Sequence, residues 1–437
     1  MTSTRFTPFQ GNVIWKVAAI LVLALLLLIP TSMIKGIISE REALQGQTIE
    51  EISNKWAKSQ ELKAIMISIP IEITYTDEDH EQIKEDFIHF LPDQLLISGN
   101  IDPQTLSRGI YQAVVYQSDL LIKGKINIPE IPLEDNITKV HYQKAFATIG
   151  ISDLRGIKEN IAFQWNGEKL EESPGTRSET NINSGVTIPL PLTTSGDYDF
   201  EYQLHLQGSK EMNFVPLGKI TEVKINSPWQ DPAFDGHFLP EHRDISQEGF
   251  NAEWKILQHN RNFPQQWRGT NQIKKWQSAV FGVKLLSPMD DYRKAMRSAK
   301  YAILTIGLTF LVFFLVEILN DRRIHPLQYI LVGLALCLFY ILLVAISEHS
   351  NFNFAYLISS TTVVGMIGGY SASVLGDRKL SFLLLISLAT TYAFLFTTLQ
   401  LTDYALLMGS IGLALILAAT MYFTRKIDWY QVNVQTN

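Results

Sequence analysis

The sequence predicts a six-span α+β membrane protein with a large, mainly antiparallel and sandwich-like β domain between its first and second transmembrane helices. Three observations predict this fold. One apolar run near the N-terminus is long enough to cross a bilayer, and five more follow one another closely in the last third of the chain. Between them, apolar and polar side chains alternate as they do in half-buried strands.

The first span is predicted over residues 13–34, centred on ILVLALLLLI. The ten Leu, Ile and Val residues between Val17 and Ile29 contribute roughly −3 to −6 kcal/mol to membrane insertion. The alternative is a cleaved signal peptide. Cleavage sites have small residues in an A-x-A-like pattern, and the run Pro30–Ile34 fits that pattern poorly, which favours an uncleaved anchor.

Five apolar runs follow from Tyr301, joined by loops of only a few residues. A soluble core helix can resemble one such run, but five in succession indicate membrane spans. The predicted organisation is a tail over 1–12, the anchor over 13–34, a helical stalk over 35–63, a β-rich domain over 64–300, a helix bundle over 301–423 and a tail over 424–437. The five spans of the bundle are predicted at 301–319, 326–346, 354–375, 380–399 and 403–423.

The loops between the predicted spans predict the orientation. Basic residues occur in the loops at 320–323 and 377–379 and at 425–426, whereas the loops at 347–350 and 400–403 contain no Lys or Arg. The positive-inside rule then places both termini in the cytoplasm and residues 35–300 on the outer side of the membrane.

One basic cluster disagrees with this orientation, because it lies at the outer end of the second span. It consists of Arg293, Lys294, Arg297 and Lys300. Long translocated domains largely escape the positive-inside rule, so the orientation is kept. The alternative role for these cations is contact with anionic headgroups of the outer leaflet.

Within the β domain, Tyr198–Gln207 is the clearest strand, because apolar residues occupy every second position. Phe250–Ile256 repeats this pattern. Asn166-Gly167 predicts a tight hairpin turn. A second hairpin is predicted with its turn at Gln117-Ser118. Many short strands separated by turn residues are typical of a β-sandwich.

The remaining composition argues against several function classes. The formal net charge is −6 without a block of like charge, so nothing indicates nucleic-acid binding. The single cysteine, Cys337, excludes an intrachain disulfide. No phosphate loop, dinucleotide fingerprint or nucleophile motif occurs. The densest polar cluster, at 235–244, lacks metal-ligand spacing and Pro240 interrupts it, which favours a solvated loop. We therefore expect no cofactor, no metal and no enzyme activity.

Titratable residues near the span ends are the candidate functional groups: Glu317, His325, Glu348, His349 and Asp403. Ionised groups inside a bilayer are costly and often functional. Glu317 lies within reach of Arg322 or Arg323, and Asp403 is placed to cap a helix. None lies at mid-membrane, where transport pathways have such groups, so anchoring or capping is favoured over transport.

Gly365 and Gly369 form a GxxxG motif in the fourth span. This spacing permits close approach of two helices. Packing within the predicted bundle is favoured over dimerisation.

Several segments are similar to one protein family. The chain resembles the CreD family of inner-membrane proteins, and the resemblance is most specific in the second half of the chain. It is less close before residue 110. There the family has Gly-Pro ahead of a short strand, and this chain has Ala64-Ile65. The segments that carry the resemblance are Phe214–Gly218, Phe263–Trp267, Phe281–Val283, His325–Leu336, Asp403–Ser410 and Arg425–Tyr430.

The resemblance implies a cell-envelope integrity protein of Gram-negative bacteria, linked to envelope and β-lactam stress, and it implies no reaction, ligand or catalytic residue. We therefore predict a non-catalytic protein whose partners are membrane lipids and a periplasmic or envelope component or another membrane protein. The alternative is a transporter or lipid-handling protein that uses the polar residues at the span ends. An envelope sensor is less favoured, because the cytoplasmic parts are too short for a signalling domain.

Overall fold

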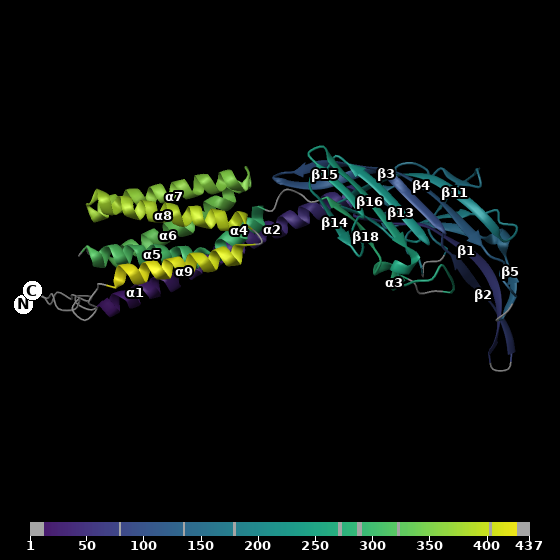
Figure 1. Cartoon of the computed structure of the whole chain (residues 1–437), viewed down its shortest axis with the longest axis horizontal. Helices are drawn as coiled ribbons and strands as arrows, with labels where there is room; N and C mark the ends of the chain where they lie inside the picture. Colours follow the sequence, from purple (N-terminus) through teal and green to yellow (C-terminus); the bar gives the residue numbers. More distant parts are fainter. Residues whose placement is uncertain are drawn as a thin grey trace, which may run out of the picture. The chain divides into compact units, whose positions relative to one another are not determined.

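The computed structural model describes residues 13–77, 80–133, 136–177, 181–269, 273–285, 291–320, 324–401 and 404–425. They form two compact units (Figure 1), one β-rich over Gly46–Pro288 and one helical over Met1–Gln45 and Met289–Asn437. Six helices are long and apolar enough to cross a membrane, one near the N-terminus and five after the β-rich unit. The predicted fold class is therefore confirmed.

The helical elements mostly follow the predicted spans. Their bounds are α1 Val13–Leu26, α2 Leu28–Trp56, α4 Asp291–Lys300, α5 Ala302–Leu319, α6 Pro326–Ser347, α7 Phe352–Leu375, α8 Arg378–Gln400 and α9 Ala405–Thr424.

The first apolar run is divided at Leu27, which separates α1 from α2. Pro30 explains the break, because it has no N–H to donate to the Leu26 carbonyl and its ring crowds that carbonyl. After Pro30 the helix continues without interruption through the predicted stalk to Trp56. Leu27 is buried at 5% exposure.

Polar residues of the connecting loops fix where the later helices begin. Asn351 caps α7 by accepting a hydrogen bond from the Phe354 N–H at 2.9 Å, and Asp377 caps α8 by accepting one from the Lys379 N–H at 2.8 Å. Such caps satisfy N–H groups that the first helical turn leaves unpaired. Gly376 has a φ of +61° and ends α7 in a left-handed conformation that glycine adopts without strain.

The β-rich unit contains a sandwich of two sheets. The larger sheet follows the order β14-β18-β12-β1-β6-β10-β9, with β2 and β5 paired to β1 and β17 paired to β2, and the second follows β15-β16-β13-β3-β4-β11-β7-β8. Pairs β1–β12 and β3–β13 are parallel, and the others are antiparallel. One hydrophobic core draws buried side chains from both sheets. The Tyr202 hydroxyl of β11 donates to the Ala64 carbonyl of β1 and joins the sheets.

The elements of the sandwich are β1 Gln60–Asp77, β2 His80–Phe90, β3 Gln94–Arg108, β4 Tyr111–Ile128, β5 Ile137–Val140, β6 Phe146–Ile151, β7 Phe163–Trp165, β8 Glu168–Leu170, β9 Ser173–Pro174, β10 Gly185–Pro189, β11 Gly196–Ser209, β12 Glu211–Phe214, β13 Ile220–Ser227, β14 Pro232–Gly236, β15 His242–Ser246, β16 Gly249–Leu257, β17 Gln266–Arg268, β18 Phe281–Leu285 and the short helix α3 Ile273–Gln277.

The local strand predictions are largely confirmed. Strands β11 and β16 contain the two alternating segments, with their apolar residues buried. The Asn166-Gly167 turn joins β7 to β8, and both residues have positive φ, 49° and 83°, as a type I′ turn requires.

The predicted hairpin turn at Gln117-Ser118 is wrong. Strand β4 runs straight through both residues, which pair with β3 on one side and β11 on the other. Ser118 is buried and its hydroxyl donates to the Leu206 carbonyl at 2.9 Å, so it satisfies its polar group inside the sheet. The turn occurs at Gly109, with a φ of +63°.

Candidate functional site

Glu317 is the centre of a polar cluster at one end of the helix bundle. It lies in the last turn of α5 and is 4% exposed. Its carboxylate forms an ion pair with the ammonium group of Lys16 on α1. The Ile324 N–H donates to Oε1 at 2.7 Å, and the Tyr329 hydroxyl on α6 donates to Oε2 at 3.0 Å. The carboxylate therefore connects α1, α5 and the start of α6.

The described residues give Glu317 an ion-pair partner that the sequence did not suggest. Arg322 and Arg323 lie outside the described residues, and the ion pair is made with Lys16, which is 301 positions away. The signal was present in the sequence, because Lys16 is the one charged residue of α1 and Glu317 is the one charged residue of α5. Two lone charges of opposite sign in apolar helices are expected to pair.

Glu348 is the centre of a second cluster, at the other end of α6, where it is the C-cap residue. Its side chain is 12% exposed. The Tyr292 hydroxyl of α4 donates to Oε1 at 3.0 Å, and Nε of Arg41 on α2 lies 3.6 Å from the same oxygen. This carboxylate therefore holds α2 and α4 against the end of α6.

The two carboxylates lie far apart. Glu317 contacts the first turn of α6 and Glu348 follows its last residue, so the 22 residues of that helix separate them. At a rise of about 1.5 Å per residue the separation is roughly 33 Å. The structure therefore does not bring these two candidates into one site.

The two candidate histidines are exposed. His325 is the N-cap of α6, where its Nδ1 accepts a hydrogen bond from the Leu327 N–H at 3.2 Å, and its own N–H donates to Gln328 at 2.9 Å. His349 lies just beyond α6. Asp403, the fifth candidate, lies outside the described residues.

The GxxxG glycines face away from the rest of the described bundle. An added Cβ at Gly365 or Gly369 would meet no described atom within 4 Å, and both residues are exposed. The prediction that they pack inside the bundle is therefore wrong, because the helix rotation turns them outward. Their neighbour Gly368 is buried instead, and a Cβ there would lie 2.8 Å from Leu385 Cδ1.

The middle of the bundle is aromatic and apolar. The Phe339 ring of α6 contacts the rings of Tyr340 in the same helix, Tyr356 of α7 and Tyr392 of α8. The Tyr356 hydroxyl donates to the Tyr392 carbonyl at 2.8 Å. A shallow groove with a volume of only about 10 Å³ lies between α5 and α8, and no charged residue lines it; its lining is Leu308, Thr309, Val312, Phe313, Leu384, Ser387, Leu388 and Thr391.

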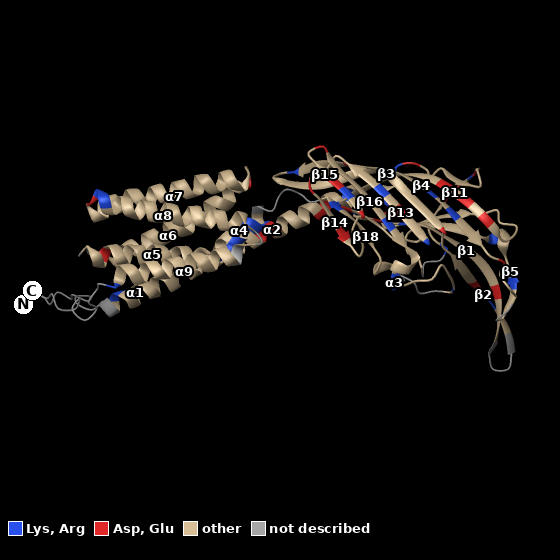
Figure 2. Cartoon of the chain, in the orientation of Figure 1, with Lys and Arg blue, Asp and Glu red and all other residues tan. Residues whose placement is uncertain are grey.

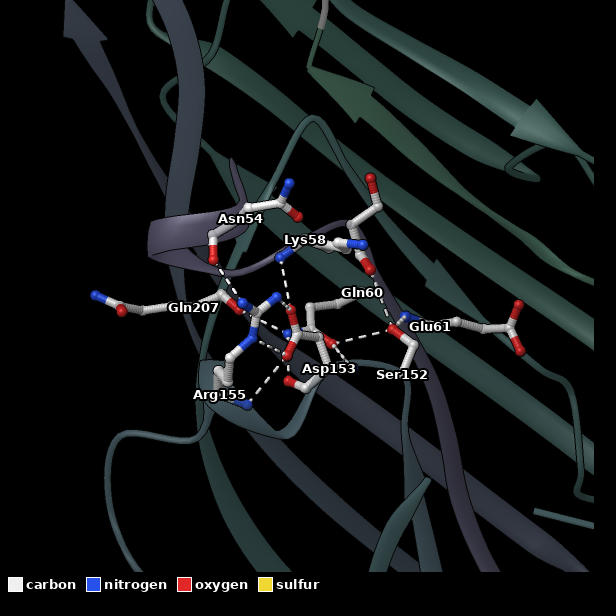
Figure 3. A network of polar contacts seen from close by, with 9 residues as sticks. Asn54, Lys58, Gln60, Glu61, Ser152, Asp153, Arg155 and Gln207 are labelled. Atoms are coloured by element: carbon white, nitrogen blue, oxygen red, sulfur yellow. Dashed lines mark hydrogen bonds and ion pairs between the residues drawn. The ribbon is translucent and has the colours of Figure 1, made fainter. Parts of the chain in front are cut away.

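In the β-rich unit, a polar network joins the end of α2 to the sandwich (Figure 3). Asp153 lies at its centre. Its carboxylate accepts the Lys58 N–H at 2.9 Å and forms a two-point contact with Arg155, with Nε at 2.9 Å and Nη2 at 2.6 Å. Arg155 also donates to the Asn54 carbonyl in the last turn of α2. The hydrogen bonds from Arg155 hold the pKa of the Asp153 carboxyl at about 2.

Gln60 and Ser152 complete this network (Figure 3). The buried Gln60 amide donates to the carbonyl oxygens of Asp153 and Gln207, each at 2.9 Å. The Ser152 hydroxyl accepts the Glu61 N–H at 2.9 Å. A two-point guanidinium–carboxylate contact and buried backbone hydrogen bonds fix geometry well. The end of α2 is thus held firmly on the sandwich.

A buried histidine in the sandwich resembles part of a catalytic arrangement. His89 is 1% exposed and contacts Ser68 Oγ through Nδ1 at 2.8 Å and the Asn181 amide nitrogen through Nε2 at 3.0 Å. A base that activates serine must lie beside a serine that a substrate can reach. Ser68 is fully buried, so the group packs β1 against β2.

The sequence cluster at 235–244 forms the crossing from β14 to β15 and is solvated in most of its length. Asp235 forms an ion pair with Lys284, which lowers the pKa of that carboxyl. Among the residues that the structure describes, no group of three or more potential metal ligands comes together.

Two comparisons with solved structures give low similarity. A two-domain M1 zinc metallopeptidase has a TM-score of 0.20 and 8% identity, over 44% of this chain and 42% of that structure. An M1 zinc metallopeptidase from Deinococcus radiodurans has a TM-score of 0.18 and 7% identity, over 48% and 53%. Scores this low carry no argument about this chain.

Comparisons of the sequence are decisive. A family model described as "Inner membrane protein CreD" matches residues 12–430. The Escherichia coli (strain K12) protein named "Inner membrane protein CreD" is 35% identical over 430 residues, which are 96% of this chain and 94% of that relative. The chain therefore belongs to the CreD family of inner membrane proteins.

Proposed function

We propose that this chain is a non-catalytic protein that supports cell-envelope integrity under envelope and β-lactam stress, and that its β domain binds an envelope component in the periplasm. The chain supplies a sandwich inserted between α2 and the second candidate membrane span, α5. The polar groups that a catalytic site would use hold structural elements together: Glu317 and Glu348 between helices, His89 between strands, and Asp153 at the junction.

The contacts between the end of α2 and the sandwich are the main support for this proposal. Here Arg155 and Asp153 clamp the last turn of α2, Ala57 is fully buried, and the Trp56 indole donates to the Tyr116 carbonyl at 3.4 Å. The last turn of α2 is thus packed into the β-rich unit, which suits a β domain that bears on an envelope component.

The proposed orientation places both termini in the cytoplasm and the sandwich in the periplasm. Lys379 and Arg425 lie at helix ends that the positive-inside rule assigns to the cytoplasm. Cys337 is buried, so the unmodified chain should give little thiol labelling. Leu133→Cys, at a side chain 67% exposed, should react in intact cells with a maleimide that cannot cross the inner membrane. Lys379→Cys should react only after lysis.

The β14–β15 crossing is the contact surface that we propose for the envelope component. Strand β15 is the edge of its sheet and all its residues are exposed. Leu239 and Ile245 are 65% and 49% exposed. An edge strand can accept an added strand, and exposed apolar side chains beside it favour binding.

The test is complementation of a deletion strain. Cells that lack the protein should show altered envelope permeability or resistance to a β-lactam, and the full chain should restore the normal response. The variant Leu239→Lys/Ile245→Lys should fail to restore it at normal expression. Leu133→Lys, an exposed apolar residue elsewhere on the sandwich, is the matched control and should restore it. A deletion strain that behaves as wild type under every envelope stress would overturn the proposal.

A further inference from the structure

Helix α4 is a short amphipathic helix with one buried face and one basic face. Tyr292, Ala295 and Ala299 are buried at 8%, 1% and 2% exposure. Arg293, Arg297 and Lys300 occupy positions i, i+4 and i+7 and therefore share a second face; Arg293 and Lys300 are exposed and Arg297 is half-buried. We call these three residues the α4 basic face.

The buried face of α4 packs on the ends of the apolar helices. Tyr292 donates to Glu348, the C-cap of α6. The Lys294 ammonium lies 5.7 Å from the centre of the Phe352 ring, at the start of α7. Arg297 Nη2 lies 3.4 Å from the Leu399 carbonyl, in the last turn of α8. Helix α4 thus lies across the ends of three apolar helices, and α5 follows it after one residue.

Aromatic residues mark this level as a membrane surface. Tyr301 separates α4 from α5, and Tyr404, 62% exposed, begins α9 at the same end. At the other end, Tyr422 of α9 is 59% exposed. The 18 residues from Tyr404 to Tyr422 span about 27 Å in a helix, close to the roughly 30 Å of a hydrocarbon core. Tyrosines favour both surfaces of that core, so α4 lies at headgroup depth.

Helix α4 is rich in basic residues. Figure 2 shows Lys and Arg gathered on α4, where four of ten residues are basic. Among the described residues, the Glu348 carboxylate lies beside α4, where Tyr292 and Arg41 contact it. A guanidinium group presents paired N–H donors that match two phosphate oxygens. At the depth of the lipid phosphates, such a face selects anionic lipids over zwitterionic ones.

We infer that the α4 basic face binds the phosphate groups of anionic phospholipids in one leaflet of the membrane. This goes beyond the proposed function, because it assigns a ligand to the helical unit and not to the sandwich. In the proposed orientation the leaflet is the outer one, although the chemistry of binding is the same in either leaflet. The headgroup is held between α4 and the lipid surface by Arg293, Arg297 and Lys300.

The test measures lipid selectivity around the full-length chain in bilayers. The purified protein is reconstituted in phosphatidylcholine, and spin-labelled phosphatidylglycerol and phosphatidylcholine report their relative association by electron paramagnetic resonance. The wild type should prefer phosphatidylglycerol. Arg293→Gln/Arg297→Gln/Lys300→Gln should lower this preference by about fivefold or more, since each basic residue near an anionic surface contributes on the order of 1 kcal/mol.

The matched control is Lys123→Gln/Lys125→Gln/Lys224→Gln, which removes three exposed cations from the sandwich. It should keep the wild-type preference. The variant Arg293→Lys/Arg297→Lys keeps the positive charges and should keep most of the preference for phosphatidylglycerol. This variant tests whether substitution in α4 by itself unfolds the protein. Circular dichroism and a monodisperse elution profile verify folding of each variant.

Two added solutes distinguish a bound lipid phosphate from a bound free phosphate ion. High salt should weaken the preference, because it screens exposed charges. Millimolar inorganic phosphate should leave the preference for phosphatidylglycerol unchanged. If added phosphate abolishes this preference, the α4 basic face binds free phosphate and the inference is wrong. The inference also fails if the triple Gln variant keeps the wild-type preference, or if the wild type has none.

Discussion

Lys16 of α1 and Glu317 of α5 form an ion pair across the helical unit, although 301 positions separate them in the sequence. In a bilayer the hydrophobic effect gives little preference for helix–helix contact over helix–lipid contact, so packing and polar contacts decide which helices associate. This pair, with the hydrogen bond from Tyr329 to the same carboxylate at 3.0 Å, therefore fixes the N-terminal helix to the helices that follow the sandwich.

Glu317→Ala should lower the free energy of unfolding by about 1–3 kcal/mol, because it leaves the Lys16 ammonium, the Tyr329 hydroxyl and the Ile324 N–H without their acceptor. Denaturant titration of the full chain in micelles measures this. The double variant Lys16→Met/Glu317→Ala should lose less than the sum of the two single variants. Additive losses would show that the two charges do not interact.

Gly333→Ala should destabilise the helical unit by about 1–3 kcal/mol, because the new Cβ would overlap Leu27 Cδ1 and force the Leu27 side chain to move. Gly365→Ala is the matched control, since its Cβ would meet no described atom within 4 Å and alanine favours a helix. Thermal unfolding of both variants tests this. Equal melting temperatures would contradict the packing of Leu27 on Gly333.

The elements of this fold were predictable because their signals are local. An apolar run indicates a span, and alternation in Tyr198–Gln207 indicates a strand, without knowledge of any partner. The Asn166-Gly167 turn is equally local. The turn at Gln117-Ser118 was predicted wrongly because β4 is 18 residues long and continues through both polar positions. Gln117 is exposed, and the buried Ser118 hydroxyl donates to the Leu206 carbonyl of the neighbouring strand.

The clusters were not predictable from local signals. His89 contacts Ser68 and Asn181 only because β1, β2 and the segment before β10 meet in the sandwich. The parallel pairing of β1 with β12 likewise joins segments about 150 positions apart, as with Gln60 and Met212. The direction in which Gly365 faces depends on the rotation of α7, which the GxxxG spacing leaves open.

Asp153→Asn should weaken the junction between α2 and the sandwich by about 1–2 kcal/mol at neutral pH. Hydrogen bonds from Arg155 lower the pKa of the Asp153 carboxyl from 3.8 to about 2. A carboxyl with a lowered pKa in the folded state stabilises it above the unfolded value, and this contribution is lost as the pH falls from about 4 to about 2. Unfolding of both proteins at a series of pH values measures the difference. Arg268→Gln, which removes an ion pair elsewhere in the sandwich and keeps Asp153 and Arg155, should lose stability over the same pH range as the wild type.

His89 should make the protein less stable as the pH falls below neutrality. Burial lowers its pKa from 6.5 to about 4, so the unfolded chain binds a proton in this range that the folded chain does not. The stabilisation from neutral His89 is therefore complete above about pH 6.5 and is lost progressively down to about pH 4, by roughly 3 kcal/mol. His89→Gln should flatten this part of the pH profile of unfolding. Replacing the exposed His349 by Gln is the matched control and should leave the slope unchanged. A wild-type profile without a slope between pH 4 and 6.5 would mean that His89 is not held neutral between Ser68 and Asn181.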